Sequence, residues 1–123
     1  MLSNFSAANV ANNADLIAIY AEDDSRHTVV CTVTLDALAD VLESRIIDQR
    51  DARRVVAAEL DKFGQVMAAK FKNQRELFQP NPAAQHILQC ALTLDDLRAS
   101  GLTFSASVLE PELQPTWGRD GEF

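Results

Sequence analysis

Two short apolar runs near the start of the chain predict a pair of strands. Leu16–Tyr20 and Thr28–Val33 are rich in apolar and β-branched residues, and the polar segment 22–26 between them suits a hairpin connection. We therefore expect two antiparallel strands. Residues 1–14 are rich in Asn, Ser and Ala without a clear period, and we interpret them as a loose lead-in.

The segment after Val33 predicts a short amphipathic helix. Thr34 suits the N-cap because its hydroxyl accepts a hydrogen bond from a free backbone N–H, and Asp36 lies near the positive end of the helix dipole. The apolar pattern runs to about Ile46, and the polar segment 48–51 then breaks it. Its apolar members, spaced by three and four residues, are Leu35, Leu38, Val41 and Leu42.

A second and longer helix is predicted by an apolar stripe in the middle of the chain. Gly64 lies inside it at a cost of roughly 1 kcal/mol relative to Ala. We therefore expect either a close neighbour that needs the missing side chain or a slightly weak helix. Pro80 and Pro82 end the pattern because proline has no backbone N–H to donate. The stripe consists of Val56, Leu60, Phe63, Met67 and Phe71.

The last third of the chain predicts one more strand, a helical turn and a tail. His86–Leu92 reads as the strand, Thr93 caps the turn, and Gly101 ends it. Alternating apolar residues after Leu102 predict a short strand that leads into an extended tail, residues 103–123. Trp117 in this tail is a candidate anchor, on the body of the protein or on a partner.

Together these elements predict a single α+β domain over residues 1–123, in which a small, largely antiparallel sheet packs against one long and one short helix. A chain of 123 residues that is 47% hydrophobic suffices for a packed core. No run approaches the roughly 18 apolar residues of a membrane span, and the first residues lack a secretory pattern. Because only two cysteines are present, we expect free thiols and a cytoplasmic location.

The charge of the chain is negative and unevenly distributed. Its net value of −7 disfavours general binding to nucleic acid, where affinity comes from Lys and Arg. Residues 1–33 sum to −3 and residues 80–123 to −4, whereas residues 34–79 hold eight charges of each sign. Mixed charges are typical of solvated helix faces. A second interpretation is an anion or partner patch formed by Arg45, Arg50, Arg53 and Arg54.

A short internal repeat joins two parts of the chain. His27–Leu38 and His86–Leu97 share six of twelve residues at a constant offset of 59. Two junctions from a strand to a Thr-capped helix explain four of these identities, since each residue is favoured there independently. The shared His and Cys leave a duplicated unit open as the second explanation.

The repeat also supplies a candidate His/Cys cluster, formed by His27, Cys31, His86 and Cys90. Imidazole and thiolate bind zinc, and a Cys–His pair is also a nucleophilic arrangement. Residues four apart on a strand are about 13 Å apart, whereas zinc ligands converge within about 2.3 Å of the metal. We therefore favour buried, structural cysteines and predict neither a metal nor a cofactor. No phosphate loop, HExxH or GxSxG motif occurs.

The order of these motifs resembles a family of short proteobacterial proteins of unknown function, with a strand, helix and strand core. The resemblance covers about residues 15–98 and implies a cytoplasmic α+β domain without an assigned catalytic residue. It rests on Cys31, Thr34, Ala37 and Leu38, on Phe63 and the segment Ala68–Phe71, and on the segment Leu92–Leu97.

The sequence leaves three functional hypotheses. The first is a non-enzymatic interaction or regulatory module with a protein partner or a second copy of itself, because no catalytic motif is present. The second is an acidic inhibitor or nucleic-acid mimic that binds a basic groove, because both ends of the chain are acidic. The third is a thiol- or metal-dependent enzyme that uses the His/Cys cluster.

Overall fold

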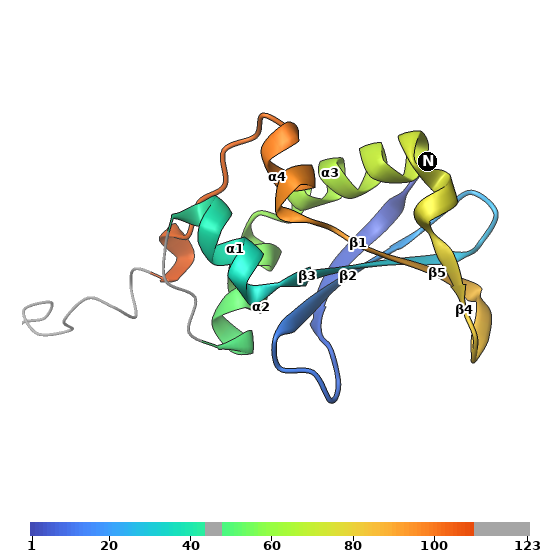
Figure 1. Cartoon of the computed structure of the whole chain (residues 1–123), viewed down its shortest axis with the longest axis horizontal. Helices are drawn as coiled ribbons and strands as arrows, with labels where there is room; N and C mark the ends of the chain where they lie inside the picture. Colours follow the sequence, from blue (N-terminus) through green and yellow to red (C-terminus); the bar gives the residue numbers. More distant parts are fainter. Residues whose placement is uncertain (44–47, 110–123) are drawn as a thin grey trace, which may run out of the picture.

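One five-stranded sheet carries four α-helices in this protein, and three of these helices lie between β3 and β4 along the chain (Figure 1). The computed structural model describes residues 1–43 and 48–109, and the elements named here belong to that part. The strands are β1 (Ser3–Asn9), β2 (Leu16–Glu22), β3 (Thr28–Thr34), β4 (Gln79–Asn81) and β5 (Ala84–Ala91). The α-helices are α1 (Leu35–Leu42), α2 (Gln49–Ala58), α3 (Leu60–Asn73) and α4 (Leu94–Ala99), and the 3-10 helices are η1 (Arg75–Leu77) and η2 (Ser107–Leu109).

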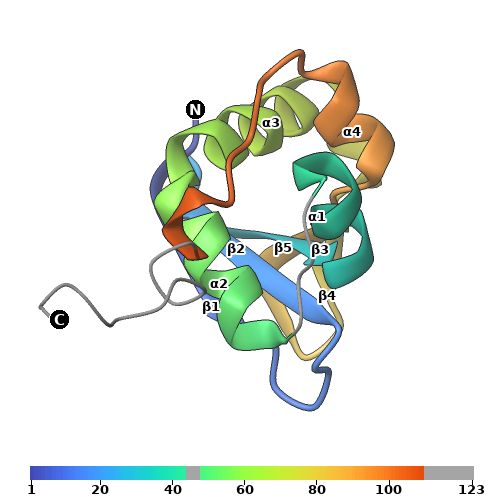
Figure 2. The same ribbon diagram turned by 90° about the vertical axis from the view of Figure 1, so that its left-hand side faces the viewer.

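The sheet has the strand order β1-β2-β3-β5-β4 and is mostly antiparallel. The pair β3 and β5 is parallel, because the chain passes through α1, α2, α3 and β4 before it returns to the sheet. Figure 2 shows α1, α3 and α4 over one face of the sheet. Helix α2 packs near β1 and β2, and its residues Ala52 and Val56 belong to the same core. The predicted α+β class with a largely antiparallel sheet is therefore confirmed.

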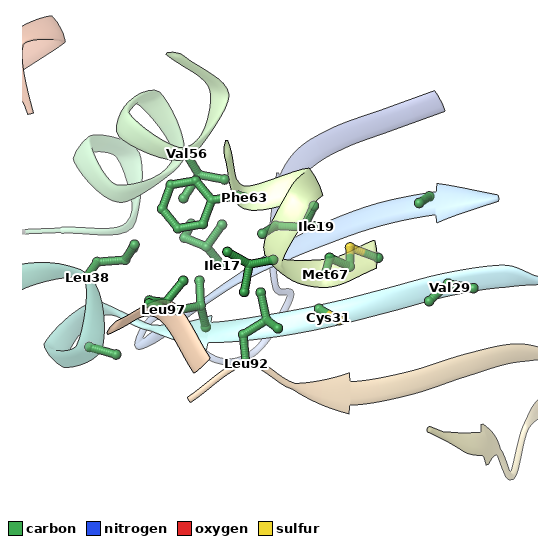
Figure 3. Close-up of a cluster of buried hydrophobic side chains, with 14 of the residues drawn as sticks. Ile17, Ile19, Val29, Cys31, Leu38, Val56, Phe63, Met67, Leu92 and Leu97 are labelled. Atoms are coloured by element: carbon green, nitrogen blue, oxygen red, sulfur yellow. The ribbon is translucent and has the colours of Figure 1, made fainter. Parts of the chain in front are cut away.

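The core lies between this face of the sheet and the helices (Figure 3). Ile17 and Ile19 of β2 point into it with Cys31 of β3, since alternate residues of a strand share a face. From the helices, Phe63 and Met67 of α3 are fully buried against them. The apolar stripe of the long predicted helix is thus the side that covers the sheet.

Both predicted helix caps are present. The Thr34 hydroxyl accepts a hydrogen bond from Ala37 N at 3.0 Å at the start of α1. Thr93 caps α4 through a reciprocal box in which its hydroxyl accepts from Asp96 N, while Asp96 accepts from Thr93 N. The hairpin prediction is also confirmed, because β2 and β3 pair in register from Leu16 to Glu22.

The interpretation of residues 1–14 as a loose lead-in is wrong, because Ser3–Asn9 forms β1 and pairs with β2. The missing alternation has two physical reasons. β1 is an edge strand with a mostly exposed surface, so small polar residues suffice along it. A register shift between Ser3 and Ser6, with Asn4 at φ 57°, also interrupts the two-residue period.

The long helix and the region around it also differ from the prediction. The polar segment 48–51 begins α2, with Asp48 as its N-cap, and the helical stripe divides between α2 and α3 at Glu59. Pro80 lies in β4 at the other sheet edge, where a missing N–H is tolerated.

The part of the tail that the structure describes is not a strand. Phe104 packs on Phe63 with ring centroids 4.6 Å apart, and the chain then forms η2. Trp117 and residues 110–123 lie outside the described residues, as does Arg45. Among the described helices, none has the length and apolarity that a membrane crossing requires.

Candidate functional site

The two cysteines of the predicted His/Cys cluster meet across neighbouring strands. Cys31 of β3 and Cys90 of β5 are direct register partners in the parallel pair, and both are free thiols. Cys31 is fully buried, whereas Cys90 is half-buried. The register offset is 90 minus 31, or 59, which equals the offset of the sequence repeat. The repeated segments therefore lie side by side as two parallel strand-to-helix units, and α1 contacts α4.

The two histidines do not join these cysteines. His27 lies before β3, where its Nδ1 is 3.3 Å from Asp23 Oδ2, and His86 is exposed near the start of β5. Each is four residues from its cysteine, about 13 Å along an extended strand. No group of three potential metal ligands occurs within residues 1–43 and 48–109. The geometry therefore divides the predicted cluster into a thiol pair and two separate imidazoles.

The surroundings of the thiol pair disfavour the thiolate form of both cysteines, because they raise the pKa of each thiol. Burial, together with the neighbouring Cys90, raises the pKa of Cys31 to about 12. Burial also raises the pKa of Cys90. Because the thiolate is the reactive form, both cysteines are poor nucleophiles at neutral pH.

A buried ion pair next to these cysteines had no signal in the sequence. Lys70 of α3, with 7% of its side chain exposed, contacts Asp96 Oδ2 at 2.5 Å and donates to Ala91 O at 2.9 Å. The pair connects α3 to the end of β5 and to the capped start of α4. Burial raises the pKa of Asp96, but the hydrogen bonds from Lys70 and Thr93 outweigh this effect and lower it below 3.8. A depression of about 340 Å³ adjoins the pair between α3 and α4.

Of the predicted arginine patch, the structure describes Arg50, Arg53 and Arg54. Arg50 and Arg53 of α2 are exposed, and Arg50 lies 3.8 Å from the Asp51 carboxylate. Arg54 has a structural role instead, since it donates to Val108 O at 3.1 Å and so links α2 to η2. Arg45 lies outside the described residues.

An open groove of about 950 Å³ lies between the start of β1 and α3. We call it the β1–α3 groove. Phe5 lies against Gly64, where an added Cβ would stand 3.3 Å from the phenyl ring. The expectation of a close neighbour at this helical glycine is therefore confirmed. The apolar lining consists of Met1, Leu2, Phe5, Gly64, Ala68 and Phe71.

Charged side chains lie at both ends of the β1–α3 groove. Asp61 comes from the first turn of α3, and Lys72 from its last turn. Arg75 follows in η1, with its guanidinium carbon 4.4 Å from the centroid of the Phe71 ring. The groove is thus apolar in the middle, acidic at one end and basic at the other.

Comparisons of the chain with protein-family models, curated proteins and solved structures gave no match. The candidate site therefore rests on geometry, and two features of the described residues stand out. The Cys31–Cys90 and Lys70–Asp96 groups lie in or beside the core, where they join β3, β5, α3 and α4. The β1–α3 groove is open and lined by apolar side chains, which is the typical character of a binding surface.

Sequence reasoning missed most of this groove because its lining comes from two segments about 60 residues apart. Leu2 and Phe5 lie in the segment read as a lead-in, and Ala68 and Lys72 lie on helix positions outside the main apolar stripe. The signal that pointed to it was Gly64, whose missing side chain indicated a close contact on this face of the helix.

Proposed function

We propose that this protein is an interaction module whose β1–α3 groove binds an extended segment of a partner protein. The partner segment carries an apolar side chain, which enters the groove beside Ala68 and Phe71, and a carboxylate, which lies near Lys72 and Arg75. The observation that supports this proposal is the open apolar groove with a basic end.

The chemistry of the groove favours a peptide over a small polar substrate. Its middle offers apolar side chains, and burial of such surface yields roughly 25 cal/mol per Å². The Arg75 guanidinium packs on Phe71, so its charge is held at the rim of the apolar surface. An apolar residue followed by an acidic one matches this order of surfaces.

The other hypotheses from the sequence receive less support. A thiol enzyme needs a reactive thiolate, and burial works against one at both Cys31 and Cys90. The acidic-mimic hypothesis and the bacterial family resemblance stay predictions. A second copy of the chain could also occupy the groove, and the sedimentation experiment described below distinguishes this from binding of a peptide.

A peptide-display selection on the full chain tests this proposal. Random twelve-residue peptides are selected, and the affinity of the enriched sequences is measured by fluorescence polarisation. We expect sequences with an apolar residue close to an acidic one. We also expect Ala68→Trp, which fills the groove, to weaken binding at least about tenfold, a loss of about 1.4 kcal/mol.

Matched variants keep this experiment specific. Ala57→Trp places the same side chain at an exposed position of α2, away from the groove lining, and should leave the affinity unchanged. Lys72→Glu should weaken binding of the acidic peptides, whereas Arg98→Glu on the exposed surface of α4 should not. The proposal is overturned if no sequence is enriched on the natural chain over Ala68→Trp. Sedimentation equilibrium reveals a second copy as the occupant if the natural chain dimerises and Ala68→Trp does not, which also overturns it.

A further inference from the structure

We propose that the partner segment binds as an added strand beside β1, antiparallel to it, with its carboxyl-terminal end at Lys72 and Arg75. This inference rests on the proposed function, because it specifies how the segment lies in the β1–α3 groove. In strand addition, main-chain hydrogen bonds supply affinity and pockets for alternate side chains supply specificity. The described residues provide both a main-chain part, the edge of β1, and a side-chain part, the apolar lining of the β1–α3 groove.

The main-chain part is the outer edge of β1. This strand stands at the end of the order β1-β2-β3-β5-β4, so β2 is its sole partner strand in the described sheet. Ser6–Asn9 keep a regular register with β2, and alternate N–H and C=O groups of an edge strand face outward. The register shift between Ser3 and Ser6 interrupts this edge toward the N-terminus. A ladder with an added strand therefore forms along Ser6–Asn9.

The side-chain part begins where this regular edge ends. Phe5 follows the ladder region toward the N-terminus and packs on Gly64, and Leu2 lies further along the same groove. Residues of an added strand that pass beyond Ser6 leave the ladder and reach the apolar lining. From Asn9 to Met1 the distance is eight residues, or about 26 Å for an extended chain. A segment of about eight residues spans both parts.

The direction of the added strand follows from the relative direction of β1 and the helices. Gln49, at the start of α2, donates to Val10 O at 3.2 Å beyond the end of β1. Phe5 lies against Gly64 in the first half of α3, and Met1 and Leu2 line the same groove as Lys72 and Arg75, at and just beyond the end of α3. β1 thus runs opposite to the direction of α2 and α3. A strand antiparallel to β1 consequently ends near Lys72 and Arg75.

Charge selects this direction over the parallel one. With antiparallel addition, a terminal or side-chain carboxylate at the end of the segment meets the two cations at Lys72 and Arg75. Asp61, at the other end of the groove, favours a positive charge that precedes the apolar residue. Parallel addition would reverse both contacts and place like charges together.

Backbone methylation of a selected peptide tests the strand ladder. Single N-methyl groups are introduced along the peptide that the display selection yields, and each affinity is measured on the natural chain. We expect alternate positions in the amino-terminal half to lose about tenfold or more, with little loss between them, because every second N–H of an added strand bonds to β1. Small and equal effects at all positions would overturn strand addition while the groove proposal stands.

A nitroxide label on either end of the same peptide tests its direction. A label at the carboxyl-terminal end should broaden the amide resonances of Lys72 and Arg75, and a label at the amino-terminal end those of Asn9 and Val10. The reverse pattern overturns the antiparallel assignment. Replacing the terminal acidic residue of the peptide with its amide should reduce affinity for the natural chain but not for Lys72→Glu. An equal loss on both proteins refutes the carboxylate contact.

Discussion

Lys70 and Asp96 form a buried ion pair, and we expect replacement of Asp96 to destabilise the protein more than replacement of Lys70. Asp96→Asn leaves the Lys70 ammonium, with 7% of its side chain exposed, beside neutral acceptors. Loss of one partner from a buried pair costs about 3–5 kcal/mol of unfolding free energy, and we expect about 3 kcal/mol because the Asn oxygen still accepts a hydrogen bond. This is a large part of the stability of a typical domain, roughly 5–15 kcal/mol.

Removal of the other partner should cost less. Lys70→Met keeps the side-chain volume and leaves the Asp96 carboxylate, whose side chain is 19% exposed and still accepts from Thr93 N at 2.9 Å. We expect a loss of about 1–2 kcal/mol, within the range for a partly unsatisfied polar group. The double variant should be more stable than the sum of the single losses implies, by about 1–3 kcal/mol, because neither charge is left alone.

Urea unfolding followed by circular dichroism measures these free energies, with calorimetry as a second probe. The melting temperature of Asp96→Asn should be about 10–15 °C lower than that of the natural chain. The slope of the unfolding free energy against urea concentration should stay constant. Asp95→Asn, a neighbouring exposed carboxyl in the first turn of α4, is the matched control and should change stability by less than about 1 kcal/mol. Equal losses for Lys70→Met and Asp96→Asn, or a loss below about 1 kcal/mol for Asp96→Asn, would refute this reasoning.

The same pair predicts a pH dependence with a definite sign. Because the pKa of Asp96 is lower in the folded protein than its usual 3.8, folding is favoured by the ionised carboxylate. This contribution is present above pH 3.8 and is lost as the pH falls through the lower folded value. The stability difference between the natural chain and Asp96→Asn should therefore be constant near neutral pH and shrink below about pH 4. A difference that grows on acidification contradicts the assignment.

Three further outcomes follow from single contacts. Gly64→Val should destabilise the fold by about 1–3 kcal/mol in urea unfolding because its side chain meets the Phe5 ring, and Phe5→Leu should restore part of the loss; independent, additive effects would contradict this contact. Iodoacetamide at pH 8 should modify Cys90 before Cys31 by mass spectrometry, because burial raises the pKa of Cys31 to about 12; equal rates would count against the buried position. Thr93→Ala should cost about 1 kcal/mol through loss of the capping box, and an unchanged melting temperature would argue against the cap.

The fold could be predicted best where the local preference of a residue for a cap or a strand agrees with its place in the packed protein. Thr34 and Thr93 are good caps in any context, and the apolar run Leu16–Tyr20 forms a strand in which Ile17, Ala18 and Ile19 are all buried. The polar composition of segment 48–51 predicts a break between helices, yet Asp48 caps α2 and the residues after it begin that helix. A polar helix start and a polar loop have the same composition, so the sequence pattern alone could not distinguish them.

The candidate site was far less predictable than the elements that form it. Gly64 indicated a close contact, but its partner Phe5 lies 59 residues away in a strand without clear alternation. The cysteines were singled out by their repeat, and it is the parallel pairing of β3 and β5 that turns a sequence offset into a contact. Lys70 carried no signal, because a lysine in an amphipathic helix has the same local pattern whether its charge is solvated or paired.

By itself, the sequence determined the local elements: which apolar, β-branched runs form strands, which residues recur as helix stripes and where two caps begin helices. These properties depend on backbone geometry and on side chains within a few residues, so they can be read along the chain. The tertiary structure decided that β1 joins the sheet edge, that Lys70 meets Asp96 and that an apolar groove opens beside α3. Such features depend on contacts between distant segments, whose energies appear only when the chain has packed and water has been excluded.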